Sequence, residues 1–273
     1  MGNINLRESV AAGKFYPARA RELNSQIASF LDPRAEKRDV LACIMPHAGY
    51  IYSGPVAGAV VSRINVPPRI VLLGPNHTGQ GTPFSLMSSG KWKTPLGEVA
   101  LDRELGKEIL SGSEYLLEDS LAHLNEHSLE VELPFFQYFR KDLSIVPVCV
   151  ASADLKALRS VGLAIAAAVD KLELNGSVLI AASSDMSHYL PQKDARRRDK
   201  LAIEAVLRLD EEELLAKVVE FDISMCGFAP VIAMLYCAKA LGAVNAELVK
   251  YQTSGDITGD HSSVVGYAGM IIN

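Results

Sequence analysis

The chain has 273 residues, of which 49% are hydrophobic and 22% charged, so it can bury a large core. Its formal net charge of −5 argues against the basic surface that nucleic-acid-binding proteins carry. No stretch approaches the roughly 20 apolar residues of a membrane span, and residues 1–13 lack the apolar run of a signal peptide, so we expect neither nucleic acid nor membrane as a partner.

Helical and strand patterns alternate along the first half of the chain. Helical spacing of apolar residues predicts a helix over 18–31. Short apolar runs that end in proline or glycine predict strands over 40–45 and 69–73, with a helix over 55–64 between them. Turn residues in 84–99 are typical of a hairpin, and Asp102 is placed to cap a helix that runs to about residue 110.

The second half continues the alternation. We predict helices over 128–139, 155–172, 195–207, 211–219 and 230–241, and strands over 144–150, 177–182, 246–252 and 264–272. Strands separated by such helices form a mostly parallel central sheet that is flanked by helices on both faces. No linker or repeat interrupts the pattern, so we expect one α/β domain over residues 1–273. Such sheets bind ligands beyond the C-terminal ends of their strands.

Three histidines follow predicted strands directly. His47 comes after the strand 40–45, His77 after 69–73 and His188 after 177–182. A lone loop histidine is more often exposed than a ligand, but that interpretation does not explain three histidines in equivalent loops. If the strands are neighbours, the imidazoles converge at one edge of the sheet. Histidine is a favoured transition-metal ligand and the usual general base near neutral pH, which indicates a metal or acid–base site.

The four cysteines do not form a disulfide framework in a chain of this length, so we expect a reducing cytoplasm. Cys43, Cys149 and Cys237 lie in apolar runs and are predicted to be buried in the core. Cys226 instead comes directly before the helix predicted to begin at Pro230. A helix N-terminus lowers the pKa of a thiol, so Cys226 is predicted to be a thiolate suited to metal ligation or nucleophilic attack.

A polar cluster at 125–130 allows two interpretations. Glu126 and Glu130 are acids of the kind favoured near the N-terminus of a helix, which would make the cluster an ordinary helix start. Alternatively, His127 acts as an acid–base residue or a substrate contact. The residues leave both interpretations open. His123 and His261 are expected at the surface.

Sequence motifs of several other chemistries do not occur. The chain has no Cys-x-x-Cys, no His-Glu-x-x-His and no phosphate-binding Gly-x-x-x-x-Gly-Lys-Ser/Thr. No Gly-x-Gly-x-x-Gly follows the first strand, and no Gly-x-Ser-x-Gly supplies a hydrolase nucleophile. The basic run 196–198 lies among charged residues and is interpreted as a solvated helix face.

Five segments together resemble a known family. They are Pro-His-Ala-Gly-Tyr-Ile-Tyr-Ser-Gly at 46–54, Gly-Pro-Asn-His at 74–77, Glu-His-Ser-Leu-Glu at 126–130, Ser-Ser-Asp-Met-Ser-His at 183–188 and Cys-Gly at 226–227. In this order they closely resemble the Memo family, whose bacterial and archaeal members are also called AmmeMemoRadiSam system protein B. The family is in turn similar to the LigB-like class III extradiol dioxygenases, non-haem iron enzymes that open catechol rings. The resemblance runs from about residue 13 to the final strand.

The resemblance implies a metal site. By motif, His47 and His77 would be its imidazole ligands and Cys226 its third ligand. Ring-opening dioxygenases use two histidines and a carboxylate around Fe(II), whereas Cys226 offers a softer thiolate that suits iron, copper or zinc. We therefore expect Fe(II) as the cofactor, with Cu or Zn as alternatives, while catechol cleavage itself is not implied.

The resemblance also assigns the neighbouring polar residues. His127 and His188 would stand where the dioxygenases keep the histidines that move protons and orient substrate, and Asp185 would line the same cleft. These residues imply a metal-dependent redox enzyme that acts on a small-molecule substrate. The alternatives are a non-enzymatic scaffold that binds a peptide segment in the same cleft, and an accessory role beside a radical-SAM partner, which the family name suggests.

Overall fold

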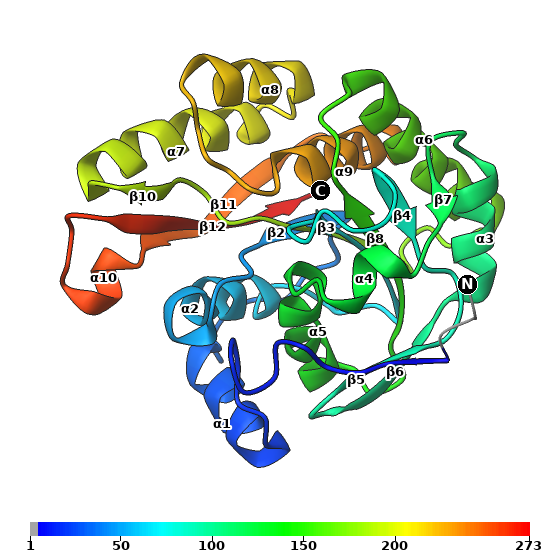
Figure 1. The fold of residues 1–273 in the computed structure, drawn as a ribbon, viewed down its shortest axis with the longest axis horizontal. Helices are drawn as coiled ribbons and strands as arrows, with labels where there is room; N and C mark the ends of the chain where they lie inside the picture. The colour runs from blue at the N-terminus through cyan, green and yellow to red at the C-terminus, as the bar shows by residue number, and fades with distance from the viewer. Residues whose placement is uncertain (1–4) are drawn as a thin grey trace.

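A sheet of twelve strands runs through the molecule, and helices cover both of its faces (Figure 1). This computed structural model describes residues 5–273. The central strands are parallel and stand in the order β6 (Gly97–Leu101), β8 (Ser144–Val150), β3 (Arg69–Pro75), β9 (Val178–Ser183) and β2 (Ala42–Met45). All residues of β2 and β9 are buried, as expected for strands that are covered on both sides. The predicted α/β class with a mostly parallel central sheet is confirmed.

Further strands extend the sheet at both ends. The strand β12 (Val264–Ile272) pairs antiparallel with β2, and β11 (Ala246–Thr253) and the short β10 (His188–Leu190) each pair antiparallel with β12. On the other side, β5 (Lys91–Thr94) pairs antiparallel with β6 and β4 (Phe84–Leu86) pairs antiparallel with β8. The short β1 (Leu6–Arg7) and β7 (Leu117–Glu118) pair in parallel with β5 and β4, respectively. The strands β5 and β6 form the predicted hairpin.

Two helical layers pack on the sheet (Figure 1). One contains α1 (Ala20–Phe30), α2 (Tyr50–Val61) and α5 (Ser128–Phe139), and the other contains α3 (Arg103–Ser111), α6 (Leu155–Lys171), α7 (Gln192–Leu207), α8 (Glu211–Glu220) and α9 (Phe228–Ala240). Side chains of successive residues in β3 point to opposite faces of the sheet. Ile70 and Leu72 pack against the layer of α1, α2 and α5, and Val71 and Leu73 pack against the other layer. Short helices α4 (Leu121–Leu124) and α10 (Gly255–Thr258) lie in loops.

Three helices begin earlier than their sequence patterns predict, and one of them is α7, which begins at Gln192 rather than at residue 195. The helix α2 begins at Tyr50 rather than at Pro55, because Gly54 does not break it. A Cβ atom at Gly54 would lie 2.3 Å from the ring of Phe30, so this glycine allows α2 to pack closely on α1. Likewise, α9 begins at Phe228, two residues before Pro230.

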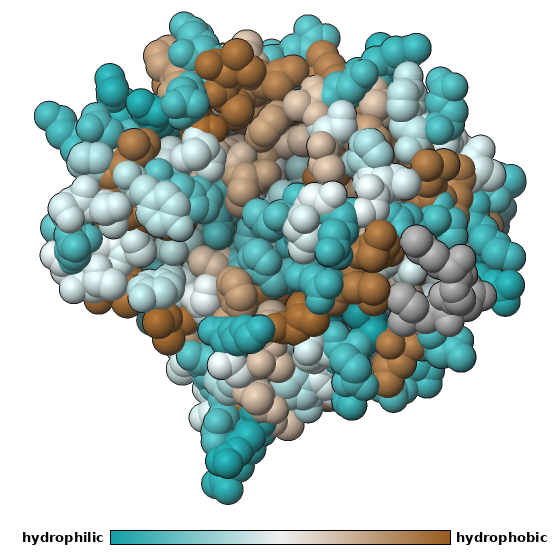
Figure 2. All heavy atoms as spheres, in the orientation of Figure 1, coloured by the Kyte–Doolittle hydropathy of each residue, from teal (hydrophilic) through white to brown (hydrophobic). Residues whose placement is uncertain are grey.

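The outer surface is mostly polar on the face shown in Figure 2, where hydrophobic residues form separate patches. The basic run 196–198 is exposed or half-buried on α7, as expected, but the adjoining Asp199 is fully buried. Its carboxylate accepts hydrogen bonds from the Ser187 N–H and the Tyr251 hydroxyl. Within residues 5–273, no helix has the length and apolar character required to cross a membrane.

Candidate metal centre

Three potential ligand atoms lie together at the C-terminal edge of the central strands. His47 follows β2, His77 follows β3, and Cys226 lies just before α9. The ligand atoms of the three side chains all lie within 4.8 Å of one another. His47 Nε2 and Cys226 Sγ are 3.4 Å apart, close to the separation of about 3.5 Å between two ligands of a tetrahedral ion. Two imidazoles and a thiol at this spacing fit a transition-metal ion.

Hydrogen bonds determine which nitrogen of His47 faces the other two ligand atoms. The ring is buried, and its Nδ1 lies 2.8 Å from Ser183 Oγ. The Ser183 hydroxyl donates its hydrogen to the Ser128 carbonyl at 2.9 Å, so it accepts a hydrogen from Nδ1. Burial also holds the pKa of His47 well below its ordinary value. The ring is therefore neutral, with the lone pair of Nε2 directed toward Cys226.

Glu126 orients His77 in a comparable way. The His77 Nδ1 donates to Glu126 Oε1 at 2.9 Å, and the backbone N–H of His77 donates to the other carboxylate oxygen. Burial of Glu126 opposes its ionisation, but hydrogen bonds from His77 and Ser128 lower its pKa to about 2. A carboxylate behind a histidine fixes the ring and leaves Nε2 free for a metal.

The role of Glu126 was not predicted from the sequence, which suggested only a helix start. Its position directly before His127 in the Glu-His-Ser-Leu-Glu segment was the available signal. His77, Glu126 and His127 also lie close enough together to hold an ion of their own. However, Glu126 Oε1 already accepts from His77 Nδ1 and from the backbone N–H groups of His127 and Ser128. We therefore interpret this group as support for His77 rather than as a second metal site.

The substitution Glu126→Gln is expected to weaken metal binding by about 10- to 100-fold, the usual cost of losing a partner behind a metal-binding histidine. A glutamine amide cannot accept all the N–H groups that now point at the carboxylate. The measurement is an anaerobic titration with Fe(II) against a competing chelator, with the exposed Glu220→Gln as control. An affinity within about twofold of the unsubstituted protein would contradict this role of Glu126.

Close packing of α9 on the end of β9 places Cys226 beside His47 and His77. A Cβ atom at Gly227 would lie 2.1 Å from the Ser183 carbonyl oxygen, so the chain can approach this closely only at a glycine. The Gly227 N–H donates to Ser184 Oγ, and the Asp185 N–H points at Cys226 Sγ at 3.3 Å. The prediction that the helix N-terminus lowers the pKa of the Cys226 thiol is wrong. Burial, followed by the charge of Asp185, raises the pKa of this thiol. A metal would therefore displace the thiol proton on binding.

Asp185 brings a carboxyl group close to the three ligand atoms. Its Oδ1 accepts the backbone N–H of His47 at 3.0 Å, and its Oδ2 lies 4.0 Å from His47 Nε2. Burial raises the pKa of Asp185 to about 6, although the charge of His188 and the N–H of His47 act in the opposite direction. A carboxyl with such a pKa exchanges protons readily near neutral pH.

The structure places His127 against the ligands and His188 nearby. The His127 ring stacks on His77, with centroids 4.8 Å apart, and on Phe15 at 4.4 Å. Burial lowers its pKa. His188 Nδ1 lies 2.8 Å from the Ser224 carbonyl oxygen, to which it donates, so its Nε2 is available. The stacking of Phe15, from the N-terminal segment, on His127 was not predicted.

His123 corrects another prediction, because it is fully buried rather than at the surface. Its Nε2 lies 3.2 Å from the Ser85 carbonyl oxygen, its Nδ1 lies 3.4 Å from Cys149 Sγ, and its ring packs on the edge of Trp92. Nothing in its local sequence signals these distant partners. His261 is exposed, and Cys43, Cys149 and Cys237 are buried, as predicted.

The buried His123 is expected to make stability depend on pH. Burial, followed by the charge of Arg7, lowers its pKa from 6.5 to about 4. Between pH 6.5 and 4 the unfolded chain therefore binds a proton at His123 that the folded protein does not bind. The contribution of the neutral, buried His123 to the free energy of unfolding is fully present above pH 6.5 and is lost as the pH falls toward 4. The loss is about 3 kcal/mol at most. Urea unfolding at pH 7 and 4.5 should show a smaller loss in His123→Gln than in the unsubstituted protein. An equal loss in both would contradict the assignment, and the exposed His261→Gln serves as control.

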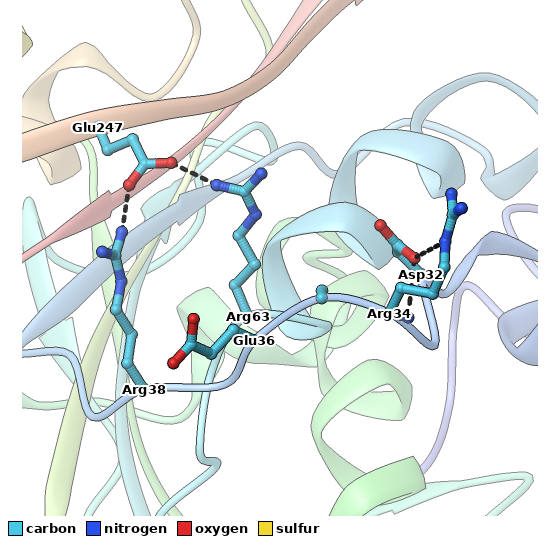
Figure 3. A pocket seen from close by; sticks show the side chains of 7 residues that line it. Asp32, Arg34, Glu36, Arg38, Arg63 and Glu247 are labelled. Atoms are coloured by element: carbon cyan, nitrogen blue, oxygen red, sulfur yellow. Dashed lines mark hydrogen bonds and ion pairs between the residues drawn. The ribbon is translucent and has the colours of Figure 1, made fainter.

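A separate hollow lies at the opposite edge of the sheet (Figure 3). Its volume is about 530 Å³, and it is lined by Asp32, Arg34, Ala35, Glu36, Arg38, Arg63 and Glu247. Arg38 and Arg63 both pair with Glu247, and Arg34 pairs with Asp32. Since its three arginines face three acids, the lining carries no net charge to attract an anion. The hollow is therefore not a candidate for phosphate recognition.

Comparison with known proteins identifies relatives along nearly the whole chain. A family model described as Memo-like protein matches residues 7–271. A MEMO1 family protein from Methanococcoides burtonii is 45% identical over 269 residues, which cover 98% of this chain and 100% of the relative. A MEMO1 family protein from Aquifex aeolicus is 44% identical over 271 residues, which cover 98% and 99% of the two chains.

A solved structure shares the fold. The crystal structure of an uncharacterized protein from Escherichia coli K12 matches with a TM-score of 0.55 at 12% identity. The match covers 84% of this chain and 98% of the other. At this identity the likeness concerns the architecture of the chain alone.

Proposed function

Because this chain belongs to the Memo family, we propose that it is a metal-binding protein with a redox role, in which His47, His77 and Cys226 hold an Fe(II) ion. The observation that carries the proposal is the convergence of these three ligand atoms, with both imidazoles already oriented by hydrogen bonds. Copper and zinc are the alternatives, since a thiolate and two imidazoles suit them as well.

The neighbouring residues supply what such chemistry needs from the protein. A bound iron or copper ion would supply electron transfer or the activation of a small oxidant. Three protein ligands leave room for a small-molecule substrate beside the ion. Asp185, with a pKa of about 6, can take up or release a proton next to His47 Nε2. His127 and Phe15 form an aromatic wall that orients the substrate.

Metal analysis of protein purified without added metal tests the proposal, followed by anaerobic loading with Fe(II) and measurement of oxygen uptake. We expect about one metal ion per chain and an oxygen uptake that disappears in His47→Ala. Absence of stoichiometric metal, together with no effect of His47→Ala, would rule the proposal out.

A non-enzymatic role in binding a peptide segment is the second candidate. Exposed apolar side chains close in sequence to His47 and His188 favour it, since Ile51 is 59% exposed and Tyr189 is 79% exposed. Tyr50 is unsuitable as a contact, because it is buried and its hydroxyl donates to the Val131 carbonyl. A pull-down whose partner is lost in Tyr189→Ala, but kept in His47→Ala, would favour this role.

The accessory role beside a radical-SAM partner can be tested by identifying the genes that neighbour the gene of this protein. A radical-SAM gene among them would favour that role.

A further inference from the structure

Asp199 is a fully buried acid that the proposed function does not use. It lies on α7, which packs on β10, β11 and β12 (Figure 1), and none of its surface is exposed. The arginines before it bind other acids, since Arg196 pairs with Asp256 and Arg197 with Asp194. Burying an acid costs free energy unless hydrogen bonds compensate for the lost water. The partners of Asp199 therefore indicate what it does.

The carboxyl of Asp199 joins segments that are distant in the sequence. Its Oδ1 accepts the backbone N–H of Ser187 at 2.9 Å, and its Oδ2 accepts the hydroxyl of Tyr251, on β11, at 2.7 Å. A Cβ atom at Gly266, on β12, would lie 2.0 Å from Asp199 Oδ2, so only a glycine leaves room for the carboxyl. The Gly266 N–H donates to the Ser187 carbonyl at 2.9 Å, and the Met186 N–H donates to the Gly266 carbonyl at 2.8 Å. Asp199 and β12 thus hold one side of the segment 184–188, which joins β9 to β10.

The other side of the segment 184–188 binds the loop that carries Cys226. The Gly227 N–H donates to Ser184 Oγ at 3.0 Å, and the Asp185 N–H points at Cys226 Sγ at 3.3 Å. These contacts lie on both sides of the thiol along the chain, so the position of Cys226 depends on where the segment 184–188 is held.

His188 is attached to the same loop at two points. Its backbone N–H donates to Ser224 Oγ at 2.8 Å, and its ring Nδ1 lies 2.8 Å from the Ser224 carbonyl oxygen. A carbonyl oxygen only accepts, so Nδ1 carries the hydrogen of this bond. Ser224 precedes Cys226 by two residues, so His188 and Cys226 are placed together.

We propose that Asp199 is a positioning residue of the metal centre, which holds the segment 184–188 from α7 and so fixes the places of Cys226 and His188. Ser187 is fully buried, so water cannot replace Asp199 as the acceptor of its N–H. Without Asp199 the segment has to shift to satisfy that N–H, and the hydrogen bonds on its other side shift with it. The placement of the segment is independent of the proposed function, whereas its effect on a metal ion rests on that function.

Two substitutions separate the hydrogen bonds of Asp199 from its bulk. Asp199→Asn keeps an oxygen for the Ser187 N–H and turns an amide N–H toward the Tyr251 oxygen, which can accept it. Asp199→Leu has a similar size but no acceptor. Glu211→Leu is the matched control, because it removes another buried acid, on the adjacent helix α8, whose partner is Lys239.

The first measurement is the hydrogen exchange of backbone amides in the metal-free protein. In Asp199→Leu we expect the amides of residues 185–188 and of Gly227 to exchange about 10-fold or more faster, while those of β3 keep their rates. Asp199→Asn and Glu211→Leu should exchange as the unsubstituted protein does. A change confined to the Ser187 amide would overturn the proposal, because Asp199 would then not act through the segment. Fast exchange of the Ser187 amide in the unsubstituted protein would overturn it without any variant.

The second measurement rests on the proposed function and uses Fe(II) and Co(II) as probes. Asp199→Leu is expected to bind Fe(II) about 10-fold or more weakly and to shift the thiolate-to-Co(II) charge-transfer band, while Asp199→Asn and Glu211→Leu leave both unchanged. Equal weakening in Asp199→Asn and Asp199→Leu would overturn the proposal, because the hydrogen bonds would then not be the cause. Failure of the unsubstituted protein to bind either ion would instead count against the proposed function, and the exchange rates would still decide whether Asp199 holds the segment.

Discussion

Replacing Cys226 by serine is expected to lower the affinity for Fe(II) by more than about 100-fold, beyond the range for losing a partner behind a ligand. The substitution removes the only sulfur among the three convergent ligand atoms. A serine hydroxyl keeps its proton at neutral pH and does not replace a thiolate, so the two imidazoles would hold the ion alone. The measurement is the metal content after anaerobic loading and dialysis, together with a titration against a competing chelator.

Matched variants identify the cause of that loss. His47→Ala should lose metal to a similar extent, because Nε2 of His47 lies 3.4 Å from Cys226 Sγ in the same cluster. The exposed His261→Ala should retain it. Retention of stoichiometric iron by both Cys226→Ser and His47→Ala would mean that the ion binds elsewhere.

Arg7→Met is expected to reduce the free energy of unfolding by about 3–5 kcal/mol, the usual cost of removing one partner of a buried ion pair. Arg7 Nη1 lies 2.6 Å from Glu130 Oε2, and both side chains are essentially inaccessible to solvent. Arg7 also donates to the backbone carbonyls of His123 and Glu126, and its guanidinium lies 4.2 Å from the Trp92 ring centroid. Its loss would leave the Glu130 carboxylate buried without its cation.

Urea unfolding at pH 7 measures this effect. The exposed Arg19→Met, which breaks a surface pair with Glu22, should cost no more than about 1 kcal/mol. The double variant Arg7→Met with Glu130→Leu should recover part of the stability, because no unpaired charge remains. A loss below about 1 kcal/mol in Arg7→Met would show that this pair does not hold the N-terminal segment on α5.

The central elements were predictable from the sequence because local patterns determine them. The helix at 128–139 and the strands at 144–150 and 264–272 have the predicted bounds, since apolar periodicity and turn residues mark both of their ends. The strands β1, β7 and β10 have only two or three residues, and their pairing depends on neighbours that no local pattern reveals. The start of α2 was misplaced because Gly54 serves packing against Phe30 rather than a turn.

Topology predicted the place of the candidate site but not the interactions that organise it. The rule that ligands bind beyond parallel strands placed His47 and His77 at one sheet edge, where the structure has them. The partner of His77 is Glu126, 49 residues away, and that of His47 is Ser183, 136 residues away. Such contacts arise only when the chain has folded. The same is true of the burial that raises the pKa of Cys226.

A crystal structure of the protein loaded with Fe(II), with anomalous data at the iron, copper and zinc edges, tests the metal site most directly. The account predicts one anomalous peak at the C-terminal edge of β2 and β3, bonded to His47 Nε2, His77 Nε2 and Cys226 Sγ. The absence of a peak, or a peak bonded to other residues, would contradict it.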